Sequence, residues 1–229
     1  MVDYFKFENQ DEDLPFYTGE TELSIRGALL LFVCLILFAV PIVFPIPMSD
    51  WQFALYLCFV LLLPTLFLLR GHADLLFKRV KRSDIKIIVL CIIFTLVYSL
   101  VMLYILIQIG VTSSEPLEGS LTFQWGTVII MMFQVMGEEL YKILAFLFFM
   151  FVFYRFSHNR KVALVIAMFI SMSSFGLMHS GFYGGFLQVF MIQGLGSIID
   201  FYAYLKTRNI LVSYAAHLIY DLLLTLPMG

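Results

Sequence analysis

The sequence predicts an all-α membrane protein, a polytopic transmembrane helical bundle of about seven spanning helices, and three observations support this prediction. Hydrophobic residues make up 62% of the 229 residues, charged residues make up 13%, and the mean hydropathy is +0.96, which is far outside the balance of soluble domains. The apolar segments run on for about 20 residues, the length of one helical crossing. They lack the strict alternation of strands in a transmembrane barrel.

The expected spans lie at 27–46, 51–69, 85–110, 125–154, 161–179, 183–205 and 209–226. Pro41, Pro45 and Pro47 can kink or end the first helix, and Pro64 can bend the second. The fourth span is too long for the hydrocarbon core alone, so we expect it to tilt or to project from the membrane. The first three spans contain almost no ionisable residues, which indicates a packing and lipid-facing role.

Residues 1–25 are polar and acidic, and they lack the basic start of a secretory signal peptide. We expect a loosely ordered cytoplasmic tail at 1–25 and a single transmembrane helical domain at 26–229. Basic residues in three short loops predict the orientation: they fall at 70–82, 155–161 and 206–208, all on one side of the predicted membrane. The positive-inside rule then predicts a cytoplasmic N-terminus and an outer C-terminus.

Composition also excludes some functions. The net charge is only −2 and no basic array with interleaved aromatic residues appears, so we expect no nucleic-acid partner. Cys34, Cys58 and Cys91 lie in three different spans without a CxxC pair, and we interpret them as buried structural thiols.

Chemically strong side chains at membrane depth all lie in the C-terminal half of the chain: Glu138, Glu139, Lys142, His179, Asp200, His217 and Asp221. An acidic residue at the centre of a spanning helix costs roughly 2.5–3.5 kcal/mol, so an adjacent pair is tolerated mainly where it faces a protein-lined or wet cavity. Lys142 is spaced to reach either glutamate, and His217 and Asp221 share one helical face. Lys142 and Asp200 stay undecided between a structural and a functional role.

Structural uses of these polar residues also stay open. His217 and Asp221 would serve as an interhelical hydrogen-bonded pair, and His179 taken alone would cap a helix end. Gln134, Gln188 and Gln193 are interpreted as interhelical hydrogen-bonding groups, and Gly194 and Gly196 as allowing close packing of the sixth helix.

Two carboxylates and two histidines in a semi-dry cavity favour hydrolysis of an amide. A buried carboxylate is a stronger base toward water, and a nearby imidazole can orient that water or stabilise an oxyanion. Covalent catalysis has little support, because no Gly-x-Ser-x-Gly elbow is present and no cysteine lies near His179 or His217 in the sequence. No HExxH motif is present either, although residues from several helices can still assemble a metal site.

Three segments resemble the motifs of the CAAX protease and bacteriocin-processing (CPBP, Abi) family of intramembrane glutamate peptidases, in the same order and with similar spacing. They are Gly-Glu-Glu-Leu-Tyr-Lys at 137–142, Phe-Gly-Leu-Met-His at 175–179 and His-Leu-Ile-Tyr-Asp at 217–221. The resemblance covers about 125–225, the expected catalytic core.

The resemblance implies a metal-free, cofactor-free peptidase in a multi-pass bacterial cytoplasmic membrane, surrounded by lipid and acting on a peptide or protein substrate such as a bacteriocin or toxin precursor. Glu138 would activate water, His179 would position that water, and His217 with Asp221 would stabilise the oxyanion. Glu139 would support the site.

Two departures from the family pattern leave an alternative open. The family usually has Arg where this chain has Ile143, and it often has Asn where this chain has Asp221. The alternative is a non-catalytic immunity or scaffold membrane protein of the same fold. A proton-coupled transporter is a weaker third possibility, because the sequence lacks internal inverted repeats.

Overall fold

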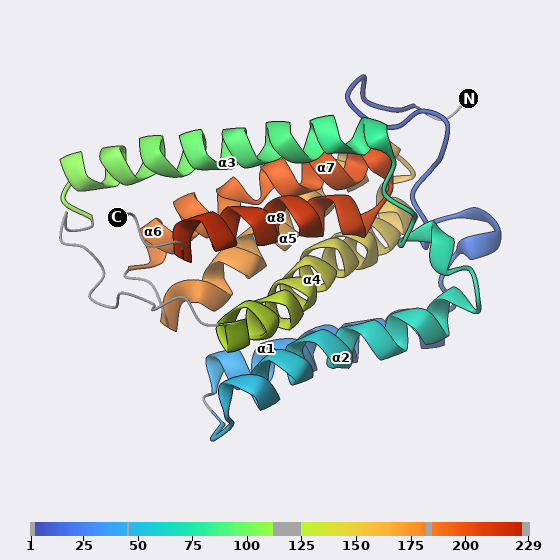
Figure 1. Cartoon of the computed structure of the whole chain (residues 1–229). Helices are drawn as coiled ribbons and strands as arrows, with labels where there is room; N and C mark the ends of the chain where they lie inside the picture. Colours follow the sequence, from blue (N-terminus) through green and yellow to red (C-terminus); the bar gives the residue numbers. More distant parts are fainter. Residues whose placement is uncertain (1–2, 45, 112–124, 182–184, 226–229) are drawn as a thin grey trace.

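The computed structural model describes residues 3–44, 46–111, 125–181 and 185–225, and these residues form an all-helical bundle (Figure 1). The long helices are α1 (Ile25–Val43), α2 (Asp50–Leu69), α3 (Arg82–Gln108), α4 (Trp125–Ser157) and α5 (Arg160–Met178). A short helix α6 (Phe186–Val189), a π-helical segment (Phe190–Gly194) and α7 (Ile198–Thr207) follow, and α8 (Ile210–Thr225) comes last. Short 3₁₀ turns lie at Gly19–Thr21, Ala73–Leu75 and His179–Gly181.

The predicted fold class is confirmed. Among the described residues, six apolar segments are long enough to cross a membrane, with α6, the π segment and α7 counted as one, and the 16-residue α8 is a shorter apolar helix. Predicted and observed boundaries agree within a few residues wherever the structure describes them. Pro45 and residues 183, 184 and 226 lie outside the described residues. Cys34, Cys58 and Cys91 are buried free thiols, as expected.

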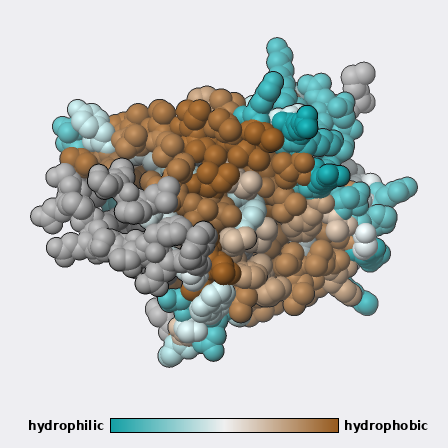
Figure 2. All heavy atoms as spheres, in the orientation of Figure 1, coloured by the Kyte–Doolittle hydropathy of each residue, from teal (hydrophilic) through white to brown (hydrophobic). Residues whose placement is uncertain are grey.

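Helix α4 is the central element. It packs against α1, α2, α5 and α8, while α3 covers α7 and α8 from the other side (Figure 1). Its middle is the core of the protein: Leu140, Ile143, Leu144, Phe146 and Leu147 are fully buried. The outer helices remain apolar toward their surroundings, and Figure 2 shows a mostly hydrophobic face between polar ends, as expected for a protein in lipid.

Two glycine contacts bring helices close together around the predicted site. A Cβ added at Gly137 would lie 2.7 Å from the backbone carbon of Leu57, so Gly137 lets α4 touch α2 one residue before Glu138. A Cβ at Gly176 would lie 2.8 Å from the Cα of Gly194. The expectation that Gly194 allows close packing is therefore confirmed.

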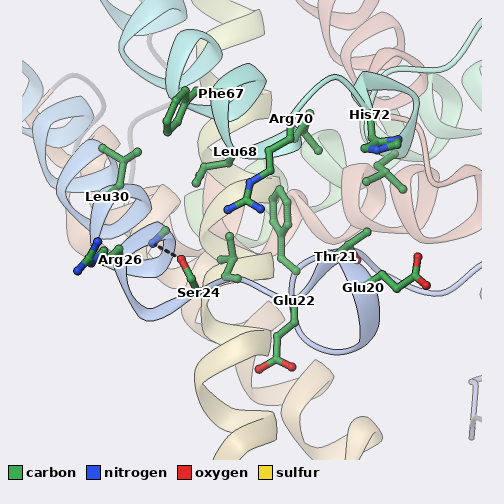
Figure 3. Close-up of a pocket in the computed structure, with 15 residues that line it drawn as sticks. Glu20, Thr21, Glu22, Ser24, Arg26, Leu30, Phe67, Leu68, Arg70 and His72 are labelled. Atoms are coloured by element: carbon green, nitrogen blue, oxygen red, sulfur yellow. Dashed lines mark hydrogen bonds between the residues drawn. The ribbon is translucent and has the colours of Figure 1, made fainter.

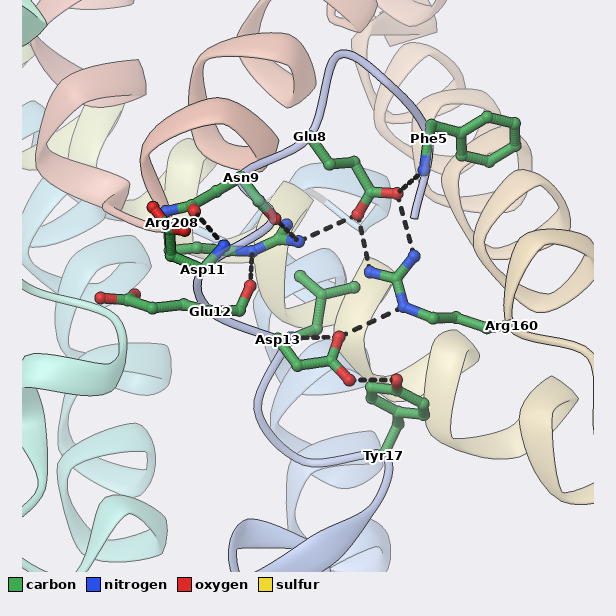
Figure 4. A network of polar contacts seen from close by, with 10 residues as sticks. Phe5, Glu8, Asn9, Asp11, Glu12, Asp13, Tyr17, Arg160 and Arg208 are labelled. Atoms are coloured by element: carbon green, nitrogen blue, oxygen red, sulfur yellow. Dashed lines mark hydrogen bonds and ion pairs between the residues drawn. The ribbon is translucent and has the colours of Figure 1, made fainter. Parts of the chain in front are cut away.

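The N-terminal segment differs from the expected loose tail. Residues 3–23 pack against one end of the bundle, where Leu14, Phe16, Tyr17 and Leu23 are buried (Figure 4). The carboxylate of Glu8 is buried and accepts hydrogen bonds from both Arg160 and Arg208, at 2.6–2.9 Å. The expectation of a loose tail was wrong because the many acidic residues suggested solvation, whereas Glu8 has two buried arginines as partners.

Another polar contact fixes the start of α8. The side-chain carboxamide of Asn209 accepts a hydrogen bond from the backbone N–H of Lys78 at 3.1 Å and donates one to the Lys78 carbonyl at 2.9 Å. This pairing ties the loop before α3 to the turn between α7 and α8. It helps to set the position of α8, which carries His217 and Asp221.

Candidate active site

Helix α4 presents its two glutamates to different environments. Consecutive residues on a helix point about 100° apart, and the side chain of Glu139 is fully buried whereas that of Glu138 is 13% exposed. One turn earlier, Gln134 donates a hydrogen bond from Nε2 to Oε1 of Glu138 at 3.1 Å. Gln134 was expected to bond between helices, but this bond lies within α4, because i and i+4 side chains are neighbours on a helix.

Lys142 joins α4 to α7. Its buried ammonium group forms ion pairs with Glu139 on its own helix and with Asp200 on α7. The backbone carbonyl of Lys142 accepts a 2.7 Å hydrogen bond from the hydroxyl of Ser171 on α5. Three helices thus fix this lysine in place.

His217 brings α8 into the same cluster. Its Nδ1 lies 2.8 Å from Oε1 of Glu139, and its Nε2 lies 3.5 Å from Oδ2 of Asp221 and 4.0 Å from Oε2 of Glu138. Both ring nitrogens therefore face carboxylate oxygens. An imidazolium matches this arrangement best, because it donates from both nitrogens.

The balance of charge in this cluster is unusual for membrane depth. Four carboxylates, those of Glu138, Glu139, Asp200 and Asp221, gather around one lysine and one histidine. Buried charges persist only where they are paired and hydrogen-bonded. Within the described residues, Oε2 of Glu139 is buried and has no hydrogen-bond partner, a feature that needs an explanation such as a functional role.

Glu139, Asp200 and His217 also have the chemistry of a metal site. Each offers one ligand atom, and these atoms lie within 4.8 Å of one another. The ammonium of Lys142, however, contacts Glu139 and Asp200 directly and lies 3.4 Å from Nδ1 of His217. The lysine therefore takes the position that a cation shared by these three groups would need.

His179 lies at the C-terminal end of α5, beside this cluster. Its Nδ1 is 2.9 Å from the carbonyl oxygen of Phe175, and its ring packs edge-on against the Phe175 ring with centroids 4.7 Å apart. The ammonium of Lys142 lies 4.8 Å from the centroid of that same ring. Phe175 therefore bridges His179 to the site.

The structure thus brings Glu138, Glu139, His217 and Asp221 together, and it places His179 against Phe175, whose ring also contacts Lys142. It also includes Lys142 and Asp200, which the sequence left undecided, and Gln134. The sequence alone singles out Lys142 and Asp200, since both are charged at membrane depth. Their ion pair could not be predicted from the sequence, because it depends on how α7 packs against α4.

Comparison with known proteins agrees with this geometry. A family model described as type II CAAX prenyl endopeptidase Rce1-like matches residues 120–223. No curated protein and no solved structure matches the chain significantly. The matched segment contains α4 to α7 and most of α8, and so every residue of the cluster. This segment, somewhat less than half of the chain, is similar to the CAAX protease and bacteriocin-processing family, to which the Rce1-like model belongs.

Proposed function

We propose that this protein is a metal-independent intramembrane endopeptidase in which Glu138 activates the attacking water. The family match supports an intramembrane protease in general. The placement of Glu138 supports its role as the base, because its carboxylate is partly exposed and lies 4.0 Å from the imidazole of His217. His217 is in turn held by the buried carboxylate of Glu139. A general base that activates water needs access to water, and the imidazole of His217 needs a fixed orientation to bind the same water.

The distances fit the first step. Glu138 Oε2 and His217 Nε2 are 4.0 Å apart, so one water molecule can hydrogen-bond to both at the usual length of about 2.8 Å. Glu138 takes a proton from this water while the water oxygen attacks the scissile carbonyl carbon. The protonated Glu138 then returns the proton to the leaving amine as the C–N bond breaks. Atoms and charges balance without a cofactor.

The surrounding residues have supporting roles in this proposal. His217, and Asp221 in its protonated form, donate hydrogen bonds to the developing oxyanion. His179 orients the water from the end of α5. Glu139, held by Lys142, fixes the ring of His217 through the 2.8 Å contact to Nδ1.

Resemblance to the family extends the proposal to substrate and location. We expect a peptide or protein substrate cleaved near or within the bilayer of a bacterial cytoplasmic membrane, such as a bacteriocin or toxin precursor. The basic loops support a cytoplasmic N-terminus.

The decisive experiment is proteolysis of candidate peptides by the purified protein in detergent. Wild type is compared with Glu138→Gln, and the exposed Glu20→Gln serves as the matched control. We expect chelator-resistant cleavage that Glu138→Gln, His179→Ala and His217→Ala each abolish and that Glu20→Gln leaves intact. Cleavage by a folded Glu138→Gln variant would refute the proposed base, and loss of wild-type activity with chelator would indicate a metal held by these residues.

Ile143 favours the second candidate, a non-catalytic immunity or scaffold protein. It is fully buried where the family usually has Arg, so a cation is missing at that position and Lys142, one residue earlier, is the cation of the site. In this case Glu138→Gln and His217→Ala would keep full resistance in a toxin-protection assay. Loss of resistance in both variants would count against a scaffold role.

A further inference from the structure

A cavity lies away from the candidate active site, where the N-terminal segment meets α1 and α2. Its volume is about 590 Å³, within the usual range for small-molecule sites. Figure 3 shows that the start of α1, the end of α2 and residues 20–24 surround it. It shares no lining residue with the site on α4, α7 and α8.

One side of the cavity is cationic. Arg26 and Arg70 line the cavity, and within the described residues neither arginine has an ion pair or a side-chain hydrogen bond. Figure 3 shows the guanidinium group of Arg70 reaching from the end of α2 toward Ser24, at the start of α1. The planar guanidinium fork of an arginine without a protein partner is suited to binding a phosphate group.

Two carboxylates also line the cavity, but neither neutralises Arg70. Glu22 is paired with Arg155 at 2.9 Å. Glu20 is exposed, and in Figure 3 both carboxylates point away from Arg70. The guanidinium group of Arg70 therefore remains available to attract an anion.

The other side of the cavity is apolar and continues onto the outer surface of the bundle. Leu30, Phe67 and Leu68 line it. Phe67 is 74% exposed, and the neighbouring Ile25 and Leu29 on α1 are 74% and 62% exposed. In a membrane these exposed apolar side chains of α1 and α2 would face lipid acyl chains. The cavity therefore lies between Arg70 and a lipid-facing surface.

We propose that this cavity binds one anionic phospholipid, with its phosphate on Arg70 and its acyl chains along Leu30 and Phe67. Charge complementarity selects the anionic head, and the continuous apolar wall selects a ligand with hydrocarbon chains rather than a soluble anion. Basic pockets between helices on the cytoplasmic side are known to hold anionic lipid headgroups, and Arg70 belongs to the basic loop that predicts this side.

Native mass spectrometry of the full-length, delipidated protein in detergent tests the proposal by titration with phosphatidylglycerol or phosphatidylcholine. Arg70→Asn is the main variant, because Arg70 has a φ of 50° and Asn tolerates this conformation. Arg79→Gln is the matched control, an exposed cation of the same loop that does not line the cavity. We expect wild type to bind one phosphatidylglycerol about tenfold more tightly than phosphatidylcholine, and Arg70→Asn to lose that preference.

Equal binding of both lipids by wild type, or an equal loss in Arg79→Gln, would overturn the proposal in favour of unspecific surface attraction. Displacement by inorganic phosphate at the concentration of the lipid would also overturn it, because the acyl chains would then contribute nothing. Leu30→Trp gives a second test that leaves the charges unchanged: filling the apolar side should weaken phosphatidylglycerol binding. Peptidase activity is not needed for any of these readouts.

Discussion

Lys142 on α4 and Asp200 on α7 form a buried ion pair between residues 58 positions apart in the sequence. The same ammonium binds Glu139, whose other contact is Nδ1 of His217. One lysine therefore links α4 and α7 directly, and it connects to α8 through Glu139. The orientation of His217 depends on this chain of contacts, so a change at Lys142 should reach the candidate active site without touching Glu138.

We predict that Lys142→Met destabilises the protein by roughly 3–5 kcal/mol, because removing one partner leaves buried carboxylates uncompensated. Asp200→Asn should cost less, because Lys142 keeps its contact with Glu139. Thermal unfolding in detergent measures both effects. A Lys142→Met variant as stable as wild type would mean that Glu139 and Asp200 are neutral in the folded protein.

The N-terminal segment provides a prediction about pH. Burial raises the pKa of Glu8, but hydrogen bonds from Arg160, from the backbone N–H of Phe5 and from Arg208 outweigh it, so the pKa of Glu8 lies below its ordinary value of 4.5. The ionised carboxylate therefore stabilises the folded state above about pH 4.5, and this stabilisation is lost as the pH falls through the lower folded pKa.

Glu8→Gln should accordingly unfold at a lower temperature than wild type at pH 7, and the difference should shrink below pH 4.5. Melting curves from pH 3 to pH 7 test this expectation, with the exposed Glu20→Gln as the control. A difference between Glu8→Gln and wild type that stays constant over this range would show that the ionisation of Glu8 is not the cause.

Gly137 allows a test of helix packing within α4. A Cβ at this position would clash with the backbone of Leu57, at 2.7 Å, whereas a Cβ at Gly126 on the same helix would meet nothing within 4 Å. We predict that Gly137→Ala destabilises the protein by roughly 1–3 kcal/mol. Gly126→Ala should be neutral or stabilising, by up to about 1 kcal/mol. Equal stabilities of the two variants would contradict the close contact between α4 and α2.

Hydropathy was enough to predict the helical bundle and most helix boundaries, because burial in lipid demands long apolar helices. The residues of the cluster were predictable for a related reason, since a charge at membrane depth is costly and therefore stands out. The partners of Lys142 were not predictable, because i+3 and i+4 spacing allowed Glu138 and Glu139 equally and only the packing of α7 adds Asp200. The packing of the N-terminal segment was not predictable either, because the arginines that pair with Glu8 lie 152 and 200 positions away in the sequence.

Asp221 stands where the family often has Asn. Its Oδ2 lies 3.5 Å from Nε2 of His217, and an ionised carboxylate would repel an oxyanion formed nearby. Asn donates a hydrogen bond without that charge, so Asp221→Asn should keep at least the wild-type rate of peptide cleavage. Asp221→Ala removes the polar group and should lower kcat by about 10²–10³-fold, the usual cost of losing one oxyanion donor.

The pH dependence separates this role from a purely structural one. If Asp221 donates only when protonated, the wild-type rate should fall as the pH rises and Asp221→Asn should remove that fall. KM is measured in parallel and should be similar in wild type and Asp221→Asn, because the side chain keeps its size. Identical pH profiles for wild type and Asp221→Asn would assign Asp221 to orienting His217 instead of contacting the oxyanion.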